Sequence, residues 1–414
     1  MDLAFTPEEE ALRAGARAWL AAHVPSSPLP SLETEAGFAA HRAWEAELAA
    51  DRWSVVNWPR EYGGRDCGLI GWLLFEEEYY AAGAPGRVNQ NGVSLLAPTL
   101  FEHGTKEQRD RVLPSMATGE VVWAQAWSEP EAGSDLASLR SRAVRAAGGW
   151  ILSGQKTWSS RAAFADRAFG LFRSDPDAPK PHQGLTYVMF DLRAPGVTVR
   201  PIGRLDGKPA FAELFLDEVF VPDEDVIGEP GQGWRIAMAT AANERGLTLR
   251  SPGRFLASAD RLLELWRARG APEWARERVA DAVIGARAYR LFTFAAASRF
   301  LAGESLGPGS SVNKVFWSEY DIALHETALD LLGADGEVTD GGLTDGEPTD
   351  SEPTDGEPTD SGLTDGELTD GEPVDADWAE RYVFALAGPI YAGANEIQRD
   401  IIAERLLGLP KGRR

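Results

Sequence analysis

The sequence predicts an α+β fold in which a sheet domain lies between two helical domains, and three observations support this prediction. The first part has helix caps and apolar residues at helical spacing. The middle has short runs of β-branched and aromatic residues separated by turns, and the last part is helical again. We expect an N-terminal helical domain at 1–120, a middle β-barrel or β-sandwich domain at 121–229 and a C-terminal helical bundle at 230–414.

The helical character of the first domain is clearest at its start. Residues 6–9 read Thr-Pro-Glu-Glu, which is a capping box with proline at the first helical position. Pro59 and the pair Gly63-Gly64 interrupt the helical pattern further along. Two sets of apolar residues recur at helical spacing: Leu12, Ala16, Trp19 and Leu20, and later Trp72, Phe75 and Tyr79.

The middle and last domains differ from each other in their patterns. Gly148-Gly149 separates two short runs and predicts a hairpin turn. Residues 185–192, 197–202 and 212–221 are rich in β-branched and aromatic side chains and predict strands. From Gly231 onward the pattern is helical, so the last domain is expected to be built from helices.

Length, charge and cysteine content exclude several classes of protein. The 414 residues contain 43% hydrophobic residues and one cysteine, Cys67, so an intrachain disulfide is impossible and a cytoplasmic location is expected. The formal net charge of −23 argues against nucleic acid as a partner. The start of the sequence lacks the pattern of a signal peptide, and no stretch is apolar enough to span a membrane.

Residues 336–375 consist of eight acidic pentads of the type Gly-Glu-Pro-Thr-Asp. They contain 14 acidic residues and no basic residue, so this segment carries more than half of the net charge. Their Gly and Pro content breaks helices, and they have no spaced apolar face. Their five-residue spacing matches neither the twelve-residue calcium-binding loop nor the nine-residue calcium-binding repeat. We therefore expect a disordered insertion between two helices of the last domain.

Two stretches of the middle domain have unusual compositions. Residues 123–135 read Trp-Ala-Gln-Ala-Trp-Ser-Glu-Pro-Glu-Ala-Gly-Ser-Asp, which ends a strand in a loop whose backbone donors can face a ligand. Residues 154–160 read Gly-Gln-Lys-Thr-Trp-Ser-Ser, which puts an aromatic ring and two hydroxyls at a strand end. Taken alone, each stretch is better explained by a turn and a core tryptophan than by a ligand site.

Two further blocks change that interpretation. Residues 228–234 read Gly-Glu-Pro-Gly-Gln-Gly-Trp ahead of a helix, and residues 390–399 read Ile-Tyr-Ala-Gly-Ala-Asn-Glu-Ile-Gln-Arg. With the first two blocks, they resemble the acyl-CoA dehydrogenase family in order and spacing, and the resemblance covers the chain except the pentads. It implies the family's three-domain fold and a flavoprotein that binds FAD, with acyl-CoA as substrate and an electron-transfer flavoprotein as electron acceptor.

The resemblance also implies roles for individual residues. The residues expected to bind FAD are Gln125, Ser128, Trp158, Ser159, Ser160 and Gly393, with Ser160 near the flavin N5 atom. The residues expected to bind the substrate are Ser134, which should meet the CoA moiety, Arg245 and Tyr391. The family removes an α-proton from the thioester while hydride leaves the β-carbon for N5. The thioester oxygen, where charge develops, is expected to accept from the backbone N–H of Ala392 and from a ribityl hydroxyl.

The reaction also requires a base, and a carboxylate in a dry pocket fits because desolvation raises its pKa. In much of the family this carboxylate follows the tyrosine of the last block, but here that position is Ala392. Other family members carry a glutamate immediately before an arginine on the helix after the Gly-Gln-Gly-Trp block. The corresponding residues here are Glu244 and Arg245, so we expect Glu244 to be the base.

Helix geometry gives Glu244 a distinctive position. At about 100° per residue, it falls at the edge of an apolar stripe. The stripe consists of Trp234, Ala237, Met238 and Ala241. A glutamate in an ion pair at the edge of a helix is the alternative explanation, and the alanine at 392 favours the base.

A second departure from the family concerns the cofactor. Most homotetrameric relatives carry Arg-x-x-Phe-Gly and Gln-x-x-Gly-Gly motifs, which hold the pyrophosphate and adenine of a neighbouring subunit's FAD. The corresponding regions here, 268–273 and 331–336, match neither motif. This resembles the branch in which two different subunits assemble, often acting on steroid or other bulky side-chain thioesters. We expect a tetramer, either homomeric or heteromeric, and the missing motifs favour the heteromer.

Two other functions remain open from the sequence. One is a flavin oxidase or monooxygenase on the same fold, and the other is a flavin-poor structural subunit of a heteromeric acyl-CoA dehydrogenase. Glu244 argues against the structural subunit, and the missing motifs argue for it.

Overall fold

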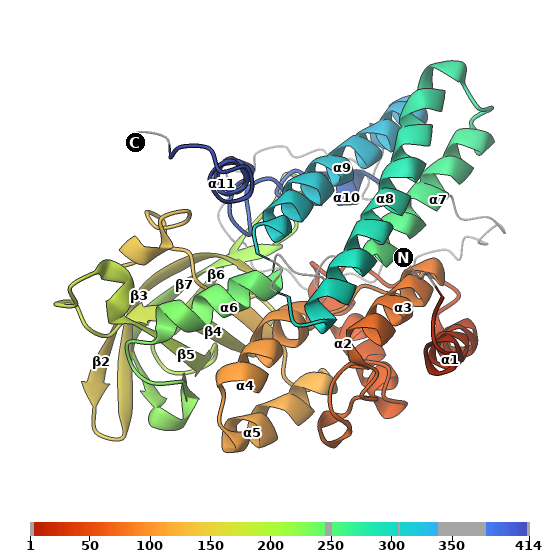
Figure 1. The fold of residues 1–414 in the computed structure, drawn as a ribbon. Coiled ribbons are helices and arrows are strands. Elements are labelled where there is room, and N and C mark those ends of the chain that lie inside the picture. Colours follow the sequence, from red (N-terminus) through yellow and green to blue (C-terminus); the bar gives the residue numbers. More distant parts are fainter. Residues whose placement is uncertain (1–3, 245–250, 305–306, 338–377, 412–414) are drawn as a thin grey trace, which may run out of the picture.

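The computed structural model describes residues 4–244, 251–304, 307–337 and 378–411, with 242–244 described by their backbone alone. Figure 1 shows two helical parts that flank a curved sheet, which confirms the α+β prediction. Arg245 and residues 338–375 of the acidic pentads lie outside the described residues.

The N-terminal helices begin as the sequence predicts. The Thr6 backbone N–H donates to Glu9 Oε2 at 2.8 Å, and the Glu9 N–H donates to Thr6 Oγ1 at 3.2 Å, so the predicted capping box is present. A π-helix at Gly92–Leu96 leads directly into α4. The helices of this part are α1 (Pro7–His23), α2 (Glu35–Ala50), α3 (Gly68–Ala81), α4 (Ala97–His103) and α5 (Lys106–Ala117).

The middle part is a single sheet of eight strands. Its order is β6-β7-β3-β2-β4-β5-β8, and β1 pairs with β4 in parallel. Gly148 at φ +74° forms the turn of the predicted hairpin between β2 and β3. The strands are β1 (Trp123–Ala126), β2 (Arg142–Ala146), β3 (Gly149–Ser160), β4 (Arg167–Arg173), β5 (Leu185–Asp191), β6 (Val197–Ile202), β7 (Phe211–Pro222) and β8 (Val226–Ile227).

The sheet is buried on both faces at β5, whereas β2 and β6 carry exposed residues. On β5, Tyr187 joins an apolar core formed with the N-terminal helices, whereas its neighbour Val188 points to the opposite face. That second face contacts residues of β3 and β7 such as Leu152 and Leu214. The curved sheet thus surrounds a core of its own, as expected of a barrel.

The C-terminal helices pack on each other and on the sheet. α7, α8 and α9 share one apolar core, and α10 and α11 pack on α9. The helices are α6 (Gly233–Glu244), α7 (Pro252–Ala268), α8 (Arg276–Leu301), α9 (Gly309–Leu332), α10 (Trp378–Ala385) and α11 (Asn395–Ile401). Within the described ranges, no helix is long and apolar enough to cross a membrane.

One carboxylate links the three parts of the molecule. Glu380 of α10 accepts from Lys208 Nζ at 2.5 Å and from Arg204 Nη2 at 3.2 Å, both in the segment between β6 and β7. It also accepts from the Ser31 hydroxyl at 2.8 Å, near the start of α2. Burial by itself raises the pKa of Glu380, but the hydrogen bonds from Lys208 and Ser31 and the two cationic charges outweigh it and lower the pKa.

The buried face of α6 differs from the predicted stripe. α6 lies against β4 and β5 (Figure 1) and buries Ile236, Ala237, Thr240 and Ala241. Met238 was expected on this face but is 37% exposed. The reason is that Gly233 meets the backbone at Leu185 and Thr186, which rotates the helix towards Ile236 and Thr240.

Candidate active site

The loop that follows β1 is tied to the end of β3. The Thr157 N–H donates to the Ser128 carbonyl at 2.9 Å, which joins the two unusual stretches of the middle domain. Gln125 on β1 and Ser128 in the loop are half-buried, and Ser134 further along is exposed. The structure therefore brings Ser128 next to the segment that carries Trp158, Ser159 and Ser160.

A buried ion pair supports this loop from behind. Lys156 is 0% exposed, and its Nζ donates to Glu129 Oε1 at 2.8 Å and to the carbonyls of Leu171 at 2.7 Å and Trp127 at 3.3 Å. Glu129 also accepts from the backbone N–H groups of Arg140 and Ser141 at 2.6 Å and 2.9 Å. These bonds fix the loop's backbone on both sides of Ser128.

The two partners have shifted pKa values with clear causes. Burial lowers the pKa of Lys156 to about 8, partly offset by the charge of Glu129. Burial would raise the pKa of Glu129, but the charge and hydrogen bond of Lys156 outweigh it, so this pKa is lowered. No sequence pattern indicates this pair, although Glu129 and Lys156 lie inside the two unusual stretches of the middle domain.

The end of β3 turns an aromatic ring outward. Its pairing with β7 shifts register between Lys156 and Ser159, and Trp158 has φ +60°. The Trp158 side chain is 60% exposed and contacts Phe211 edge-on with ring centroids 5.8 Å apart. A left-handed backbone is unfavourable for a bulky residue, and bulges of this kind redirect side chains next to functional sites.

Ser159 and Ser160 follow at the same strand end. Ser159 is buried, and its hydroxyl has no hydrogen-bond partner within the part of the chain that the structure describes. Ser160 is half-buried. The strand end thus presents an exposed indole and a buried hydroxyl that no described residue bonds to.

The predicted base lies at the end of α6. Thr240 Oγ1 lies 2.7 Å from Thr99 Oγ1 of α4 and 3.3 Å from the Tyr187 hydroxyl of β5. Glu244 is the last residue of α6, one turn beyond Thr240. The side chain of Glu244 and the whole of Arg245 lie outside the described residues.

The last block forms a tight loop between α10 and α11. Ala392 has φ +56° and Gly393 has φ +82°. The Gly393 carbonyl accepts from Gln398 Nε2 at 3.1 Å, whereas the Ala392 N–H has no acceptor among the described residues. The Tyr391 ring packs against Trp317, with ring centroids 5.9 Å apart.

A second buried lysine holds this loop. Lys314 of α9 is 0% exposed, and its Nζ donates to the Gly388 carbonyl at 2.9 Å and to Asn395 Oδ1 at 2.7 Å. Asn395 in turn donates from Nδ2 to the Ser318 hydroxyl at 3.1 Å. The sequence analysis did not select Lys314, because a lysine in a helical stretch usually lies on the solvated face.

The regions that lack the ADP-binding motifs contact each other. Arg269, just after α7, donates from Nη1 to Asp335 Oδ2 at 2.6 Å, just after α9. The Arg269 side chain is 31% exposed and that of Asp335 65% exposed. The ion pair of Lys156 and Glu129 behind the loop after β1 is buried, whereas the pair of Arg269 and Asp335 is exposed to solvent.

Family models for all three domains match the chain in order. The model of the acyl-CoA dehydrogenase N-terminal domain matches residues 6–120, that of the middle domain 124–219 and that of the C-terminal domain 231–407. The acyl-CoA dehydrogenase IpdE1 of Mycolicibacterium smegmatis is 36% identical, covering 98% of this chain and 98% of the relative. The chain belongs to the acyl-CoA dehydrogenase family. This confirms the family predicted from the four sequence blocks and makes the chain an oxidoreductase.

Solved structures of two-component members of the family share the fold of this acyl-CoA dehydrogenase. The Tcur3481-Tcur3483 steroid ACAD superposes with a TM-score of 0.82 at 27% identity and covers 100% of both chains. The ChsE4-ChsE5 complex from Mycobacterium tuberculosis superposes with a TM-score of 0.78 at 26% identity, again over 100% of both chains. Both names describe an assembly of two different chains.

Proposed function

We propose that this chain catalyses the FAD-dependent α,β-dehydrogenation of an acyl-CoA thioester, with Glu244 removing the α-proton. FAD, when bound, supplies the acceptor for the hydride that leaves the β-carbon. The chain's own residues hold the flavin ring, orient the thioester and accept the proton. An electron-transfer flavoprotein is the proposed acceptor of the electrons.

The observation that carries this proposal is the strained end of β3. Trp158 has a left-handed backbone and an exposed indole, and the neighbouring Ser159 hydroxyl is buried without a partner among the described residues. A flat aromatic cofactor with hydrogen-bonding edges fits both features, because it covers the indole and can bond to hydroxyls. Gln125, Ser128, Ser160 and Gly393 are the other proposed FAD contacts.

The loop between α10 and α11 supports the proposed handling of the thioester. A thioester oxygen gains negative charge as the α-proton leaves, so a fixed donor aimed at it accelerates the reaction. The Ala392 N–H is available for this role, and Lys314 and Asn395 keep its loop in place. Tyr391, Arg245 and Ser134 are the other proposed substrate contacts, with Ser134 on the CoA moiety.

The assignment of the base rests on the position of residue 244. Alanine occupies position 392, so the carboxylate has to come from elsewhere. Glu244 lies at the end of α6, whose preceding turn is packed between β5 and α4. A carboxyl that acts as a base needs a pKa raised towards the working pH of the enzyme, and we propose that a site closed by bound substrate supplies the desolvation that raises it.

We also propose that the chain works in a heteromeric tetramer. The exposed pair of Arg269 and Asp335 joins the two regions that match neither of the family's ADP-binding motifs. The two-component relatives have the same fold over their whole length. α8 also exposes large apolar side chains, and such surfaces are typical of subunit interfaces. They include Ile284, Leu291, Phe292, Phe300 and Leu301.

The base is tested by the substitution Glu244→Gln in the FAD-loaded enzyme. This change keeps size and hydrogen bonding but removes proton affinity. The rate of flavin bleaching by an acyl-CoA, followed anaerobically by absorbance, is expected to fall by about 10²–10⁴ or more. Binding of FAD and CoA ester should change little. Glu396→Gln, an exposed glutamate of α11, is the matched control and should bleach at the unaltered rate.

Bleaching by Glu244→Gln at the unaltered rate would contradict the assignment. The competing functions are separated in the same sample. A flavin oxidase or monooxygenase would turn over at a substantial rate with oxygen as sole acceptor. A flavin-poor structural subunit would show no bleaching of its own flavin even in the complete assembly.

A further inference from the structure

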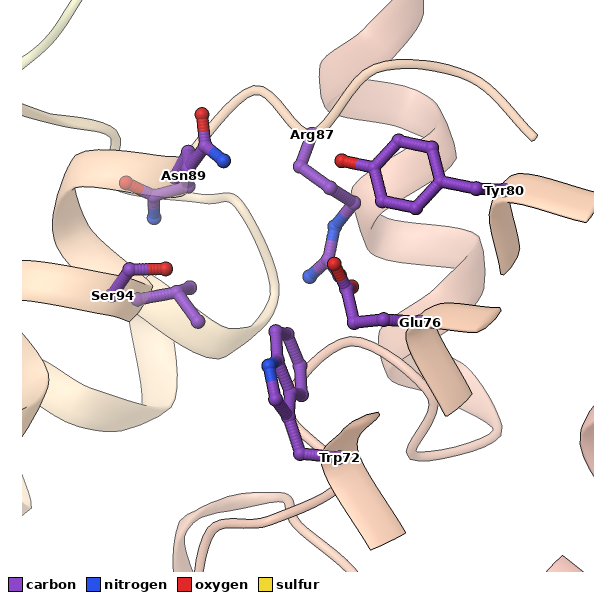
Figure 2. Close-up of a pocket in the computed structure, with 8 residues that line it drawn as sticks. Trp72, Glu76, Tyr80, Arg87, Asn89 and Ser94 are labelled. Atoms are coloured by element: carbon purple, nitrogen blue, oxygen red, sulfur yellow. The ribbon is translucent and has the colours of Figure 1, made fainter. Parts of the chain in front are cut away.

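A narrow hollow lies in the N-terminal part, between α3 and the π-helix Gly92–Leu96. The empty space in the hollow, including the solvent at its open mouth, is about 300 Å³. The enclosed part is much smaller and has room for about one water molecule. Figure 2 shows the carboxyl of Glu76 and the guanidinium of Arg87 close together on one side, with Ser94 across from them. The residues that line it are Trp72, Glu76, Tyr80, Arg87, Asn89, Gln90, Val93 and Ser94.

Two donors that line the hollow have no hydrogen-bond acceptor among the residues that the structure describes. Trp72 is 4% exposed, and its Nε1–H has no hydrogen-bond acceptor within the described ranges. The Arg87 side chain is 8% exposed, and it directs Nε and Nη2 to Glu45 and to the Ser54 carbonyl. Its Nη1 is left without an acceptor in the same part of the chain. Buried donors without acceptors are rare in proteins and indicate an oxygen that belongs there.

The charge of the hollow is close to zero at neutral pH. Glu45 of α2 neutralises Arg87 through their close ion pair. Burial raises the pKa of Glu76 to about 7, partly offset by the charge of Arg87 and by the Ser251 hydroxyl, with Glu45 acting in the same direction as burial. Glu76 therefore carries its proton in a large part of the molecules at pH 7. A neutral acceptor oxygen fits such a site better than a carboxylate does.

The hollow is close to the proposed catalytic end of α6. The π-helix that lines it runs into α4, where Thr99 bonds to Thr240 one turn before Glu244. On its other side, α7 begins directly against α3. A Cβ at Gly253 would lie 2.5 Å from the backbone oxygen of Glu76, so the two backbones are in contact. The hollow therefore lies between the end of α6 and the start of α7.

We propose that this hollow is a subsite for a carbonyl oxygen carried by the acyl group, bound by the Trp72 Nε1–H, the Arg87 Nη1–H and the Glu76 carboxyl. The proposal rests on the proposed function, since it assigns a substrate class to the same site. The acyl group would be a keto-acyl thioester whose oxygen lies away from the reacting carbons. A room of about one water molecule suits a single oxygen and is too small for a ring.

Binding and turnover of paired thioesters test the subsite in the FAD-loaded assembly. The probes are straight-chain acyl-CoA thioesters of increasing length, each compared with the same thioester carrying one keto oxygen near its far end. At the matching length, the keto form is expected to have a roughly tenfold lower Kd and a higher kcat/KM. Trp72→Phe should reduce this preference to about threefold or less. Val93→Ala, which alters the lining without a polar group, should keep it.

The pH dependence of the preference for keto thioesters shows whether Glu76 binds the oxygen or only supports the structure. The preference should fall as pH rises through about 7, because an ionised Glu76 no longer donates and can pair with Arg87. In Glu76→Gln the preference should persist with little change over the same pH range, since the amide always donates. Melting temperatures check that each variant folds.

Two results would overturn the subsite. One is equal Kd values for the paired thioesters at every length in the unaltered enzyme. The other is a preference that survives Trp72→Phe unchanged, which would leave the hollow a place for structural water. Because Kd is measured without turnover, absence of flavin bleaching with all thioesters would contradict the proposed function and still leave the subsite tested.

Discussion

The two ends of the proposed flavin site are built very differently. At the ring end, Lys156 and Glu129 form a buried ion pair that holds the loop after β1 through backbone carbonyls and N–H groups. At the ADP end, Arg269 and Asp335 form a solvent-exposed pair between the ends of α7 and α9.

The difference indicates which part of a shared site this chain supplies. A buried, fully bonded pair fixes backbone positions accurately, and accurate positions are needed where chemistry takes place. An exposed pair contributes little stability and fixes little. We propose that the chain contributes the reacting end of the site and that a partner subunit contributes the grip on ADP.

The largest effect is expected when the buried ion pair at the ring end of the proposed flavin site is broken. Lys156→Met leaves Glu129 as a buried charge without its partner, so the free energy of unfolding should fall by about 3–5 kcal/mol. Arg269→Ala removes the exposed pair and should lower it by less than about 1 kcal/mol. Urea unfolding of both variants measures the contrast. If the free energy of unfolding fell by a similar amount in the two variants, the proposed difference between the buried and the exposed ion pair would be contradicted.

A smaller effect concerns flavin affinity alone. Trp158→Ala removes an exposed ring that the protein core does not use, so FAD affinity should weaken by roughly three- to tenfold while the melting temperature stays nearly constant. Trp274→Ala, which removes another exposed tryptophan, should change neither. FAD titration by fluorescence and a melting curve give both readings. Unchanged FAD affinity in Trp158→Ala would contradict the proposal that the end of β3 binds the flavin ring.

A third prediction concerns the carboxylate that links the parts. The pKa of Glu380 is lowered in the folded chain, so its contribution to stability is fully present above its ordinary pKa of about 4.5. That contribution is lost as pH falls through the lowered pKa. Glu380→Gln should cost about 1 kcal/mol at neutral pH and less in acid, and urea unfolding at several pH values measures it. A loss that is the same at acid and neutral pH would contradict this role.

The smallest effect is expected from the acidic pentads. Deleting residues 336–375 removes sequence that lacks a core-forming pattern, so melting temperature and flavin bleaching should stay close to those of the full chain. A clear drop in either quantity would show that the pentads have a role that their sequence pattern does not reveal.

The sequence predicted the fold well wherever local patterns decide the structure. The capping box at Thr6, the hairpin at Gly148 and the strands of the middle domain follow from spacing and turn residues. The exposed face of α6 was predicted less well, because the contact of Gly233 with β5 rotates the helix.

The support for the candidate site was harder to predict. Strict alternation along β3 puts Lys156 and Trp158 on one face, yet one is fully buried and the other exposed. The register shift between Lys156 and Ser159 separates them, and no pattern in the sequence marks it. Lys314 is buried because α11 and the loop before it cover it, which is a long-range contact.

The central claim is that this chain carries the reacting end of a flavin site completed by a second subunit. The most direct measurement is the flavin absorbance per chain, for the protein purified alone and for the protein coexpressed with the products of neighbouring genes. We expect weak, substoichiometric FAD binding in the protein alone, and full loading with a partner together with bleaching by acyl-CoA. A yellow homotetramer with one tightly bound FAD per subunit would contradict it.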